Sequence, residues 1–201
     1  MLEKEGEKLL IDPGAFCFIE GILKPEDIPT PDVVLITHTH LDHCDPAALK
    51  KIIKKQTLVL ANHEVCEVLA ENKIPCEEIS GGHTRSVHDF DIHAINCQHV
   101  PIFAKLPENT AFLIDGTFLH PGDSTTIHGI HCRVVLLPIG PYASPIESAK
   151  MARLLMPDIV IPCHDAALKQ FLLERMIKGI ETVLPGVKIV TLKQSESFEI
   201  I

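Results

Sequence analysis

The chain has 201 residues, of which 46% are hydrophobic, and a formal net charge of -9 from 18 basic and 27 acidic residues. This composition fits one folded domain over residues 1–201, excludes disorder throughout, and gives no reason to expect nucleic acid or an acidic membrane as the main partner. No apolar run is long enough to span a membrane, and the charged start MLEKEGEKLL lacks the apolar stretch of a signal peptide, so we expect a cytoplasmic protein.

Apolar and β-branched segments alternate with helical ones along the chain, which is typical of an α/β fold. Helix starts are marked by Asp45 followed by Pro46, and by Ser144, Pro145 and Glu147, which form a capping box with proline at its first helical position. The segments that predict strands are, in chain order, LLIDP, VVLIT, TLVLA, FDIHAI, TAFLID, RVVLLPIG, DIVIPC and VKIVTL.

Two of these segments resemble each other. Residues 31–38 (PDVVLITH) are echoed by residues 157–164 (PDIVIPCH), and an Ala-Ala-Leu helix start follows each. Ligands of open α/β sheets bind beyond the carboxyl ends of strands, so His38 and His164 would face one shared site. Two buried strands of similar composition would also give this likeness, without any repeat.

The strongest chemical signal is the motif Thr37-His38-Thr39-His40-Leu41-Asp42-His43, directly after an apolar strand. A loop there can gather three histidines and one aspartate around a single centre. Neutral imidazole and carboxylate are ligands that zinc prefers and that manganese or iron also accept. The motif therefore predicts a metal site.

The motif and its surroundings resemble the metallo-β-lactamase superfamily, whose defining pattern is His-x-His-x-Asp-His after a strand. In the same order as the family, the chain continues with His99 in INCQHVPI, Asp123 in FLHPGDS and His164 in IVIPCHD, and it opens with LLIDPG. The resemblance covers roughly residues 8 to 170 and is greatest to the ascorbate-6-phosphate lactonase-like branch. It implies an αββα sandwich.

The resemblance also implies a ligand set for two divalent metal ions. His38, His40 and His99 would hold one ion, Asp42, His43 and His164 the second, and Asp123 would bridge both. Such a pair leaves positions open for a shared hydroxide, the nucleophile of a hydrolase. Asp42 and Asp123 are then the catalytic candidates.

The remaining histidines carry weaker signals. His120 precedes Asp123 by three residues and could contact a metal ligand without binding the ion itself, but we expect it at an exposed strand end. No spacing connects the others to a site, and we interpret them as surface or core residues: His63, His83, His88, His93, His128 and His131.

The seven cysteines are odd in number and lack CxxC spacing, so they predict no disulfide framework and favour a reducing compartment. Cys44, Cys97 and Cys163 each lie within two residues of a predicted ligand. Each of them could act as a thiolate in the site or pack as a small buried side chain, and we favour the buried role.

Substrate selection is expected from three loops beside the ligands. They are residues 13–21 with Phe16 and Phe18, residues 100–109 with Phe103 and Lys105, and residues 138–144 with Tyr142. Lys105 could meet an anionic group and Tyr142 could donate a proton, although solvated or packed roles are commoner for such residues.

The chain departs from the family at its start, where the first strand is short or missing, and it lacks the large insertion and basic surface of the family's RNA-processing nucleases. We therefore expect a dinuclear hydrolase of a small ester, lactone or phosphate-containing metabolite, with zinc as the first candidate metal. The alternatives are an iron-containing redox enzyme of the same fold, a nuclease, and a noncatalytic metal-binding protein. A homo-oligomer is compatible with the sequence.

Overall fold

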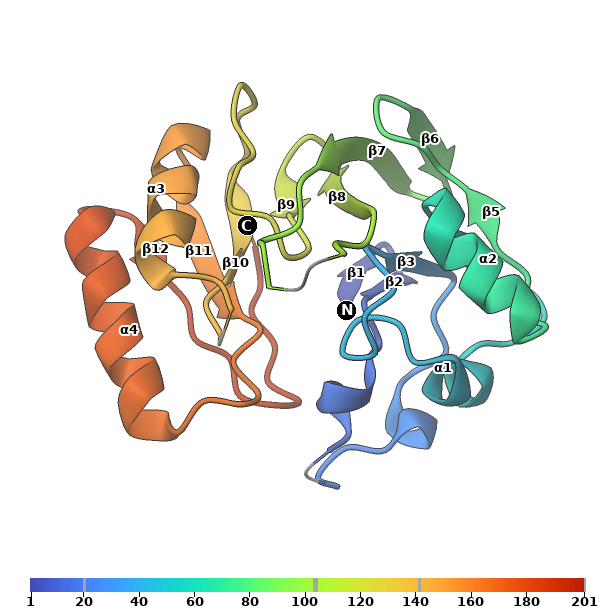
Figure 1. Ribbon diagram of the computed structural model, residues 1–201. Helices are drawn as coiled ribbons and strands as arrows, with labels where there is room; N and C mark the ends of the chain where they lie inside the picture. Colours follow the sequence, from blue (N-terminus) through green and yellow to red (C-terminus); the bar gives the residue numbers. More distant parts are fainter. Residues whose placement is uncertain (20, 103–104, 141, 201) are drawn as a thin grey trace.

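The computed structural model describes residues 1–19, 21–102, 105–140 and 142–200, and these residues form two sheets between two helical layers (Figure 1). The first sheet has the order β1 to β5, namely β1 (Leu2–Lys4), β2 (Glu7–Ile11), β3 (Val33–Ile36), β4 (Leu58–Ala61) and β5 (Glu77–Glu78). The second has the order β12 to β6, namely β12 (Lys188–Ile189), β11 (Ile159–Cys163), β10 (Val134–Pro138), β9 (Phe118–His120), β8 (Asn109–Ile114), β7 (Phe90–Cys97) and β6 (Thr84–Val87).

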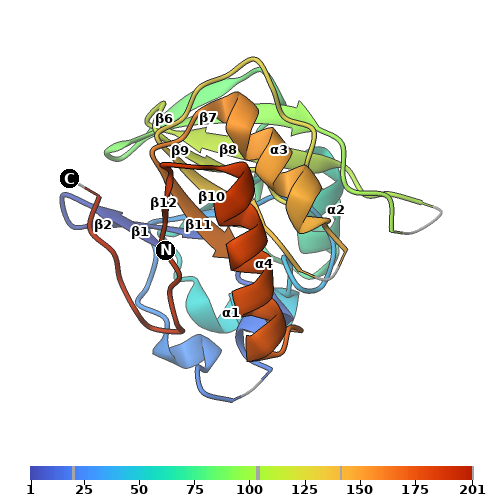
Figure 2. The same ribbon diagram turned by 90° about the vertical axis from the view of Figure 1, so that its left-hand side faces the viewer.

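Each sheet carries helices on its outer face. Helices α1 (Pro46–Ile52) and α2 (His63–Glu71) cover the first sheet, and α3 (Pro145–Leu155) and α4 (Gln170–Val183) lie side by side over the second (Figure 2). Two short 3-10 helices, η1 (Ala15–Cys17) and η2 (Pro25–Asp27), precede β3. No helix in the described part of the chain has the length and apolar character needed to cross a membrane.

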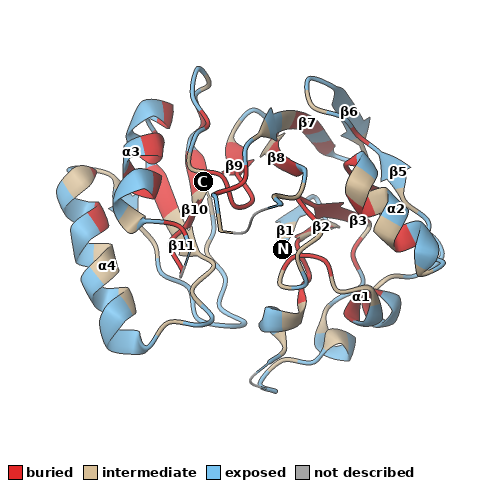
Figure 3. Ribbon diagram, viewed as in Figure 1, coloured by how far each residue is buried: buried red, intermediate tan, exposed pale blue. Residues whose placement is uncertain are grey.

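The strand sequences explain this layering because their apolar side chains point alternately to the two faces of a sheet. In β3, Val33 and Leu35 face the second sheet, whereas Val34 and Ile36 pack under α1 and α2. Figure 3 shows the resulting buried strands between more exposed helices. The expected αββα order is confirmed.

All eight predicted strand segments form strands, although only Lys188–Ile189 of the last one pairs. Three short strands, β1, β5 and β9, and the polar edge strand β6 carry too few apolar residues to be recognised from sequence. The first strand is indeed short, since β1 spans 3 residues and runs antiparallel to β2.

The two predicted helix starts differ in outcome. Asp45 caps α1 as expected, because its carboxylate accepts hydrogen bonds from the backbone N–H groups of Ala47 (2.9 Å) and Ala48 (3.2 Å). Ser144 precedes α3, but its side chain makes no capping hydrogen bond, so the predicted capping box is wrong. Ser144 is exposed, so water can take the place of that bond, and Pro145 still starts the helix in a favourable conformation.

The expectation that no cysteines pair is also wrong. Cys66 on α2 forms a disulfide bond with Cys76, which lies between α2 and β5, and their Cα atoms are 5.4 Å apart. The sequence did not reveal this pair because ten residues separate the two cysteines and a helix turns one toward the other.

The disulfide predicts how many cysteines react with an alkylating reagent. Alkylation of the unfolded, unreduced protein should modify only the five free cysteines, Cys17, Cys44, Cys97, Cys132 and Cys163, as measured by mass spectrometry. Because the bond closes a short loop, Cys66→Ser should lower the free energy of unfolding by about 2 to 4 kcal/mol under oxidising conditions. Cys17→Ser, at an exposed free cysteine, is the control. Modification of all seven cysteines would contradict the bond.

Candidate metal centre

The predicted ligands all follow strand ends at one edge of the sandwich. In the first sheet β2, β3 and β4 run parallel, and in the second β9, β10 and β11 do. Two antiparallel steps make β7 run in the same direction as β9. The backbone N–H of Thr110 in β8 donates to the carbonyl of Thr37 after β3 at 3.0 Å, which joins the sheets at this edge. Loops from both sheets therefore meet there.

Asp12, directly after β2, holds the loop that follows β3. Its buried carboxylate accepts hydrogen bonds from the backbone N–H of Thr37 (2.8 Å) and from the hydroxyl of Thr37 (2.7 Å). A third bond joins it to Nδ1 of His43 at 2.8 Å, where the ionised carboxylate accepts and the imidazole donates. In the sequence, Asp12 is recognisable only as part of an Asp-Pro turn after an apolar strand. Its contacts with Thr37 and His43 depend on the pairing of β2 with β3, which the sequence alone does not show.

One group of potential ligands combines both sheets. Its ligand atoms all lie within 4.8 Å of one another and belong to His38, His40, His99 and Asp123. Nδ1 of His38 lies 3.0 Å from the Thr37 hydroxyl, and Nδ1 of His99 donates to the carbonyl of Val100 at 2.7 Å. These bonds leave Nε2 of both rings directed to the centre.

A second group adjoins the first. It contains Asp42, His43 and His164, whose ligand atoms again lie within 4.8 Å of one another. Nε2 of His164 is 3.0 Å from Oδ2 of Asp42, and Nε2 of His43 is 3.8 Å from the same oxygen. His164 has a φ of 65°, a left-handed conformation that turns the chain sharply after β11.

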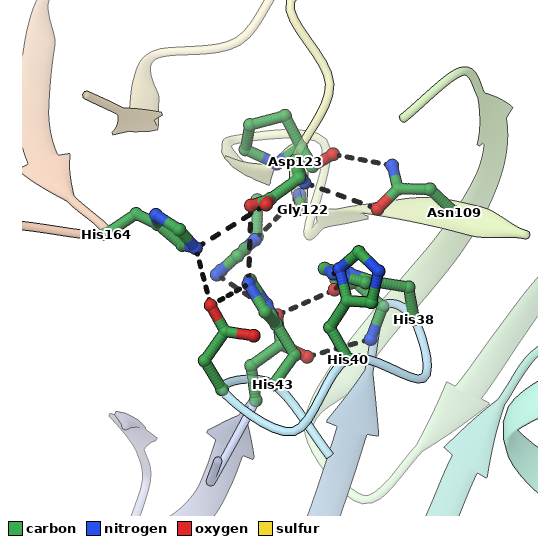
Figure 4. Close-up of polar contacts among 12 residues, drawn as sticks. His38, His40, His43, Asn109, Gly122, Asp123 and His164 are labelled. Carbon is green, nitrogen blue, oxygen red and sulfur yellow. Dashed lines mark hydrogen bonds and ion pairs between the residues drawn. The ribbon is translucent and has the colours of Figure 1, made fainter. Parts of the chain in front are cut away.

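Asp123 lies between the two groups (Figure 4). Its Oδ1 is 3.3 Å from Nε2 of His43, and its Oδ2 is 3.5 Å from Nε2 of both His99 and His164. Figure 4 shows His164 reaching this carboxylate from the side opposite His38 and His40. One carboxylate therefore contacts members of both groups.

Asn109, at the start of β8, positions the turn that carries Asp123. Its side-chain oxygen accepts from the backbone N–H of Asp123 at 3.3 Å, and its amide nitrogen donates to the carbonyl of Pro121 at 3.1 Å. Gly122 has a φ of 57°, and a Cβ at this residue would collide with the side-chain oxygen of Asn109. Only glycine fits this turn without strain. Sequence reasoning missed Asn109.

Burial and charge set the protonation of these groups. Burial, together with the neighbouring histidines, pushes the pKa of His38 far below its usual range, so this ring is neutral. Burial would also lower the pKa of His43, but the carboxylates of Asp12 and Asp123 outweigh burial and raise the pKa to about 10. Despite burial, His164 and His43 lower the pKa of Asp42 to about 2. The centre thus contains ionised carboxylates that favour a cation.

Three buried polar atoms indicate whether the centre suits a metal ion. Among the described residues, Nε2 of His43, Nε2 of His99 and Oδ1 of Asp123 have no hydrogen-bond partner of acceptable geometry. Each unpaired buried polar atom costs about 1 to 3 kcal/mol. All three belong to the two groups and face their shared centre. Imidazole nitrogens and carboxylate oxygens that lack other partners are the donor set that a divalent cation satisfies.

The expectation for His120 is wrong. It lies at the end of β9 but is buried, with Nδ1 accepting from the backbone N–H of Gly122 at 3.0 Å and Nε2 3.8 Å from Oδ2 of Asp12. The reason is that β9 is a central strand, between β8 and β10, and the first sheet covers its end. His120 therefore lies beneath the metal loop rather than in solvent.

The remaining candidates lie outside both ligand groups. Cys44 is buried against α1 and α2, Sγ of Cys97 is 3.7 Å from the carbonyl of Pro121, and burial raises the pKa of the Cys163 thiol. No cysteine among the described residues joins the histidine and aspartate groups. His93 is half-buried, and the other five weakly signalled histidines are exposed: His63, His83, His88, His128 and His131.

The residues singled out in the three candidate substrate loops differ in exposure. Phe16, Lys105 and Tyr142 are exposed, and Phe18 is half-buried. Phe103 lies outside the described residues.

Comparison with known proteins gives consistent matches. A family model described as a β-lactamase superfamily domain matches residues 1–164. The chain is 27% identical to a UPF0173 metal-dependent hydrolase of Methanopyrus kandleri, over 98% of this chain and 94% of the relative. It is 31% identical to one of Thermoplasma volcanium, over 80% of this chain and 77% of the relative. The structure of the metallo hydrolase Igni18 from Ignicoccus hospitalis shares the fold, with a TM-score of 0.71, 19% identity and coverage of 99% and 94% of the two chains.

The contacts of Asp12 predict its effect on metal binding. Asp12→Asn removes the charge that keeps Nδ1 of His43 protonated. Because the Asp12 carboxylate orients a ligand rather than binding the ion, this change should weaken metal affinity about 10- to 100-fold. Titration against a chromophoric chelator measures this change. Asp32→Asn is the matched control, since Asp32 accepts a backbone hydrogen bond from Lys8 at the opposite end of the same strands. Unchanged affinity in Asp12→Asn would show that the contact does not position His43.

Proposed function

This chain belongs to the β-lactamase superfamily domain family, and from that premise we propose that its centre binds two divalent metal ions and hydrolyses a small ester, lactone or phosphate-containing metabolite. The chain is a metal-dependent hydrolase of the metallo-β-lactamase fold, like the relatives it matches. The observation that carries the proposal is the position of Asp123, whose carboxylate contacts both ligand groups. The lactone is included because the pattern of motifs resembles that of the ascorbate-6-phosphate lactonase-like branch.

In this proposal the two ions have separate ligands and one shared ligand. His38, His40 and His99 hold the first ion, and Asp42, His43 and His164 hold the second. Asp123 bridges them, which its 3.3 Å and 3.5 Å distances to histidines of both groups support. Zinc is the first candidate, and these ligands also suit manganese or iron.

When bound, two such ions would lower the pKa of a shared water molecule and polarise the substrate oxygen that gains charge. The residues of the chain set up this chemistry. Asp12 keeps the proton of His43 on Nδ1, so that Nε2 offers its lone pair to the centre. Among the three carboxylates, Asp42 is the most exposed, at 17% against 7% for Asp12 and 5% for Asp123. We therefore assign Asp42 the side of the leaving group, where it assists departure.

The proposed bridging role of Asp123 predicts different metal contents for two variants. Asp123→Asn should reduce binding of both ions and lower kcat/KM by more than about 100-fold, because it removes a shared charged ligand. His43→Ala should chiefly remove the second ion. Metal content per chain, measured by mass spectrometry of the elements, separates these outcomes. Near-complete retention of both ions in Asp123→Asn would reject the bridge.

The positions of the cations argue against a polynucleotide substrate. Lys50 and Lys51 lie in the last turn of α1, a 7-residue helix that starts just after the metal loop and leads away from it, and Lys54 and Lys55 follow the end of this helix. Lys51 pairs with Glu26 at 3.1 Å, and Arg85 pairs with Glu77 at 2.6 Å. A nuclease needs a basic track over several phosphates.

This charge distribution predicts a weak salt dependence. Hydrolysis of small substrates should change by less than about threefold between 50 mM and 500 mM salt, because the loops expected around the centre carry few cations whose attraction for a substrate salt would screen. Activity on a lactone panel, on bis-aryl phosphate and on single-stranded RNA is compared over that series. Efficient RNA cleavage that falls steeply with salt and disappears in His40→Ala would overturn the assignment to small substrates.

Metal identity separates hydrolysis from the redox alternative. Protein purified without added metal should contain zinc or manganese and be colourless, whereas iron with visible absorbance would favour redox chemistry. Full metal content without turnover of any ester, lactone or phosphate would favour a noncatalytic metal-binding protein.

A further inference from the structure

We propose that the substrate is an ester or lactone with an apolar acyl chain, which lies on an apolar rim formed by Phe16, Leu41 and Tyr142. This inference rests on the proposed hydrolase function and narrows its substrate class. The rim lies on three separate segments: one is the metal loop itself, and the other two approach the backbone of a predicted metal ligand closely, Asp42 in one case and His164 in the other.

Leu41 brings the rim closest to the centre. It stands between His40 and Asp42, which belong to different ligand groups, yet its side chain is 59% exposed. Leu41 is therefore not one of the buried apolar residues that form the core. Its exposed surface is instead available to a molecule bound at the metal centre.

Phe16 extends this surface. The backbone N–H of Ala15 donates to the carbonyl of Leu41 at 2.8 Å, which places η1 directly beside the metal loop. The contact is close, because a Cβ on Gly14 would collide with the backbone of Asp42. Phe16 follows these two residues and is 40% exposed.

Tyr142 belongs to the side of the centre that carries His164. The backbone N–H of Ile139 donates to the carbonyl of Cys163 at 3.0 Å, and a Cβ on Gly140 would collide with the carbonyl of His164. Two residues later, Tyr142 is 52% exposed. The rim therefore has apolar surface on both sides of the predicted ligands.

The stretches that carry Phe16 and Tyr142 lack basic residues, which argues against their holding a phosphate group. Residues 13–19 (PGAFCFI) and 138–146 (PIGPYASPI) contain no Asp, Glu, Lys or Arg. Sites that hold a phosphate group use Arg, Lys or helix N-termini to balance its charge. An acyl chain, in contrast, gains from these segments because it removes apolar surface from water.

A second copy of the chain is the competing occupant, and the size of the rim disfavours it. Stable protein interfaces bury roughly 1,200 to 2,000 Å² in total and involve about 20 to 30 residues on each side. Three side chains fall far below that extent, but they are sufficient to contact one chain of several methylene groups.

The first experiment varies the acyl chain. Zinc-loaded protein is assayed with 4-nitrophenyl esters and γ-lactones whose chains increase by one methylene group at a time, and with bis(4-nitrophenyl) phosphate. We expect kcat/KM to rise about two- to fourfold per added methylene group until the rim is covered. A flat series, or preference for the phosphate, would overturn the inference.

A matched pair of variants tests the rim itself. Leu41→Ser removes rim surface, and Leu154→Ser on α3 is the control, because both leucines are 59% exposed. Leu41→Ser should flatten the chain-length dependence to below about 1.5-fold per methylene group, whereas Leu154→Ser should not change it. Phe16→Ser provides a second rim variant outside the ligand motif. Equal metal content in all four proteins shows that the ligands are intact, and an unchanged slope in both rim variants would refute the rim.

A binding measurement separates this inference from the proposed function. By calorimetry, octanoate should bind at least about tenfold more tightly than butyrate, and Leu41→Ser should remove that difference. If no substrate is hydrolysed, the hydrolase proposal fails, while the binding result still decides whether the rim holds an apolar chain. Equal affinity for both acids, or a dimer that Leu41→Ser converts to a monomer, would overturn the rim.

Discussion

The buried carboxylate of Asp12 is the constraint on which the geometry of the centre depends. A carboxylate in this position is tolerated only when donors satisfy it, and three donors come from the loop after β3: the backbone N–H and hydroxyl of Thr37 and Nδ1 of His43. Any other loop conformation would leave the charge unsatisfied. The loop is therefore held in the form that directs its histidines and Asp42 toward the second sheet.

The second sheet completes the centre because its strands end at the same edge. His99, Asp123 and His164 follow β7, β9 and β11, so they approach the loop from the second sheet. The hydrogen bond from Thr110 to the carbonyl of Thr37 at 3.0 Å and the bond from the Asn62 side chain, after β4, to the carbonyl of Glu108 at 3.1 Å join the two sheets there. The geometry of the metal centre thus depends on how the two sheets pack.

Several features could be predicted from sequence because they depend on local chemistry. The α/β class follows from the alternation of apolar strand segments such as Val33–Ile36 with helical segments, the αββα order from the family resemblance, and the cap of α1 from Asp45 and Pro46. Other interpretations were wrong where the outcome depended on neighbours. His120 looked like an exposed strand end but is covered by the first sheet, and Cys66 pairs with Cys76 because α2 faces the segment before β5.

By itself, the sequence determined eight of the strands, the start of α1, the metal-binding motif and the order of the predicted ligands, since propensity, capping and donor type are properties of short segments. Only the tertiary structure decided that His38 and His164 lie at one centre, that Asp123 contacts both ligand groups, and that Asp12 and Asn109 position them. It also decided that Leu41 is exposed beside that centre. The physical reason is that burial and hydrogen-bond partners depend on which strand ends lie side by side, and residues far apart in the chain meet only when two sheets close over one core.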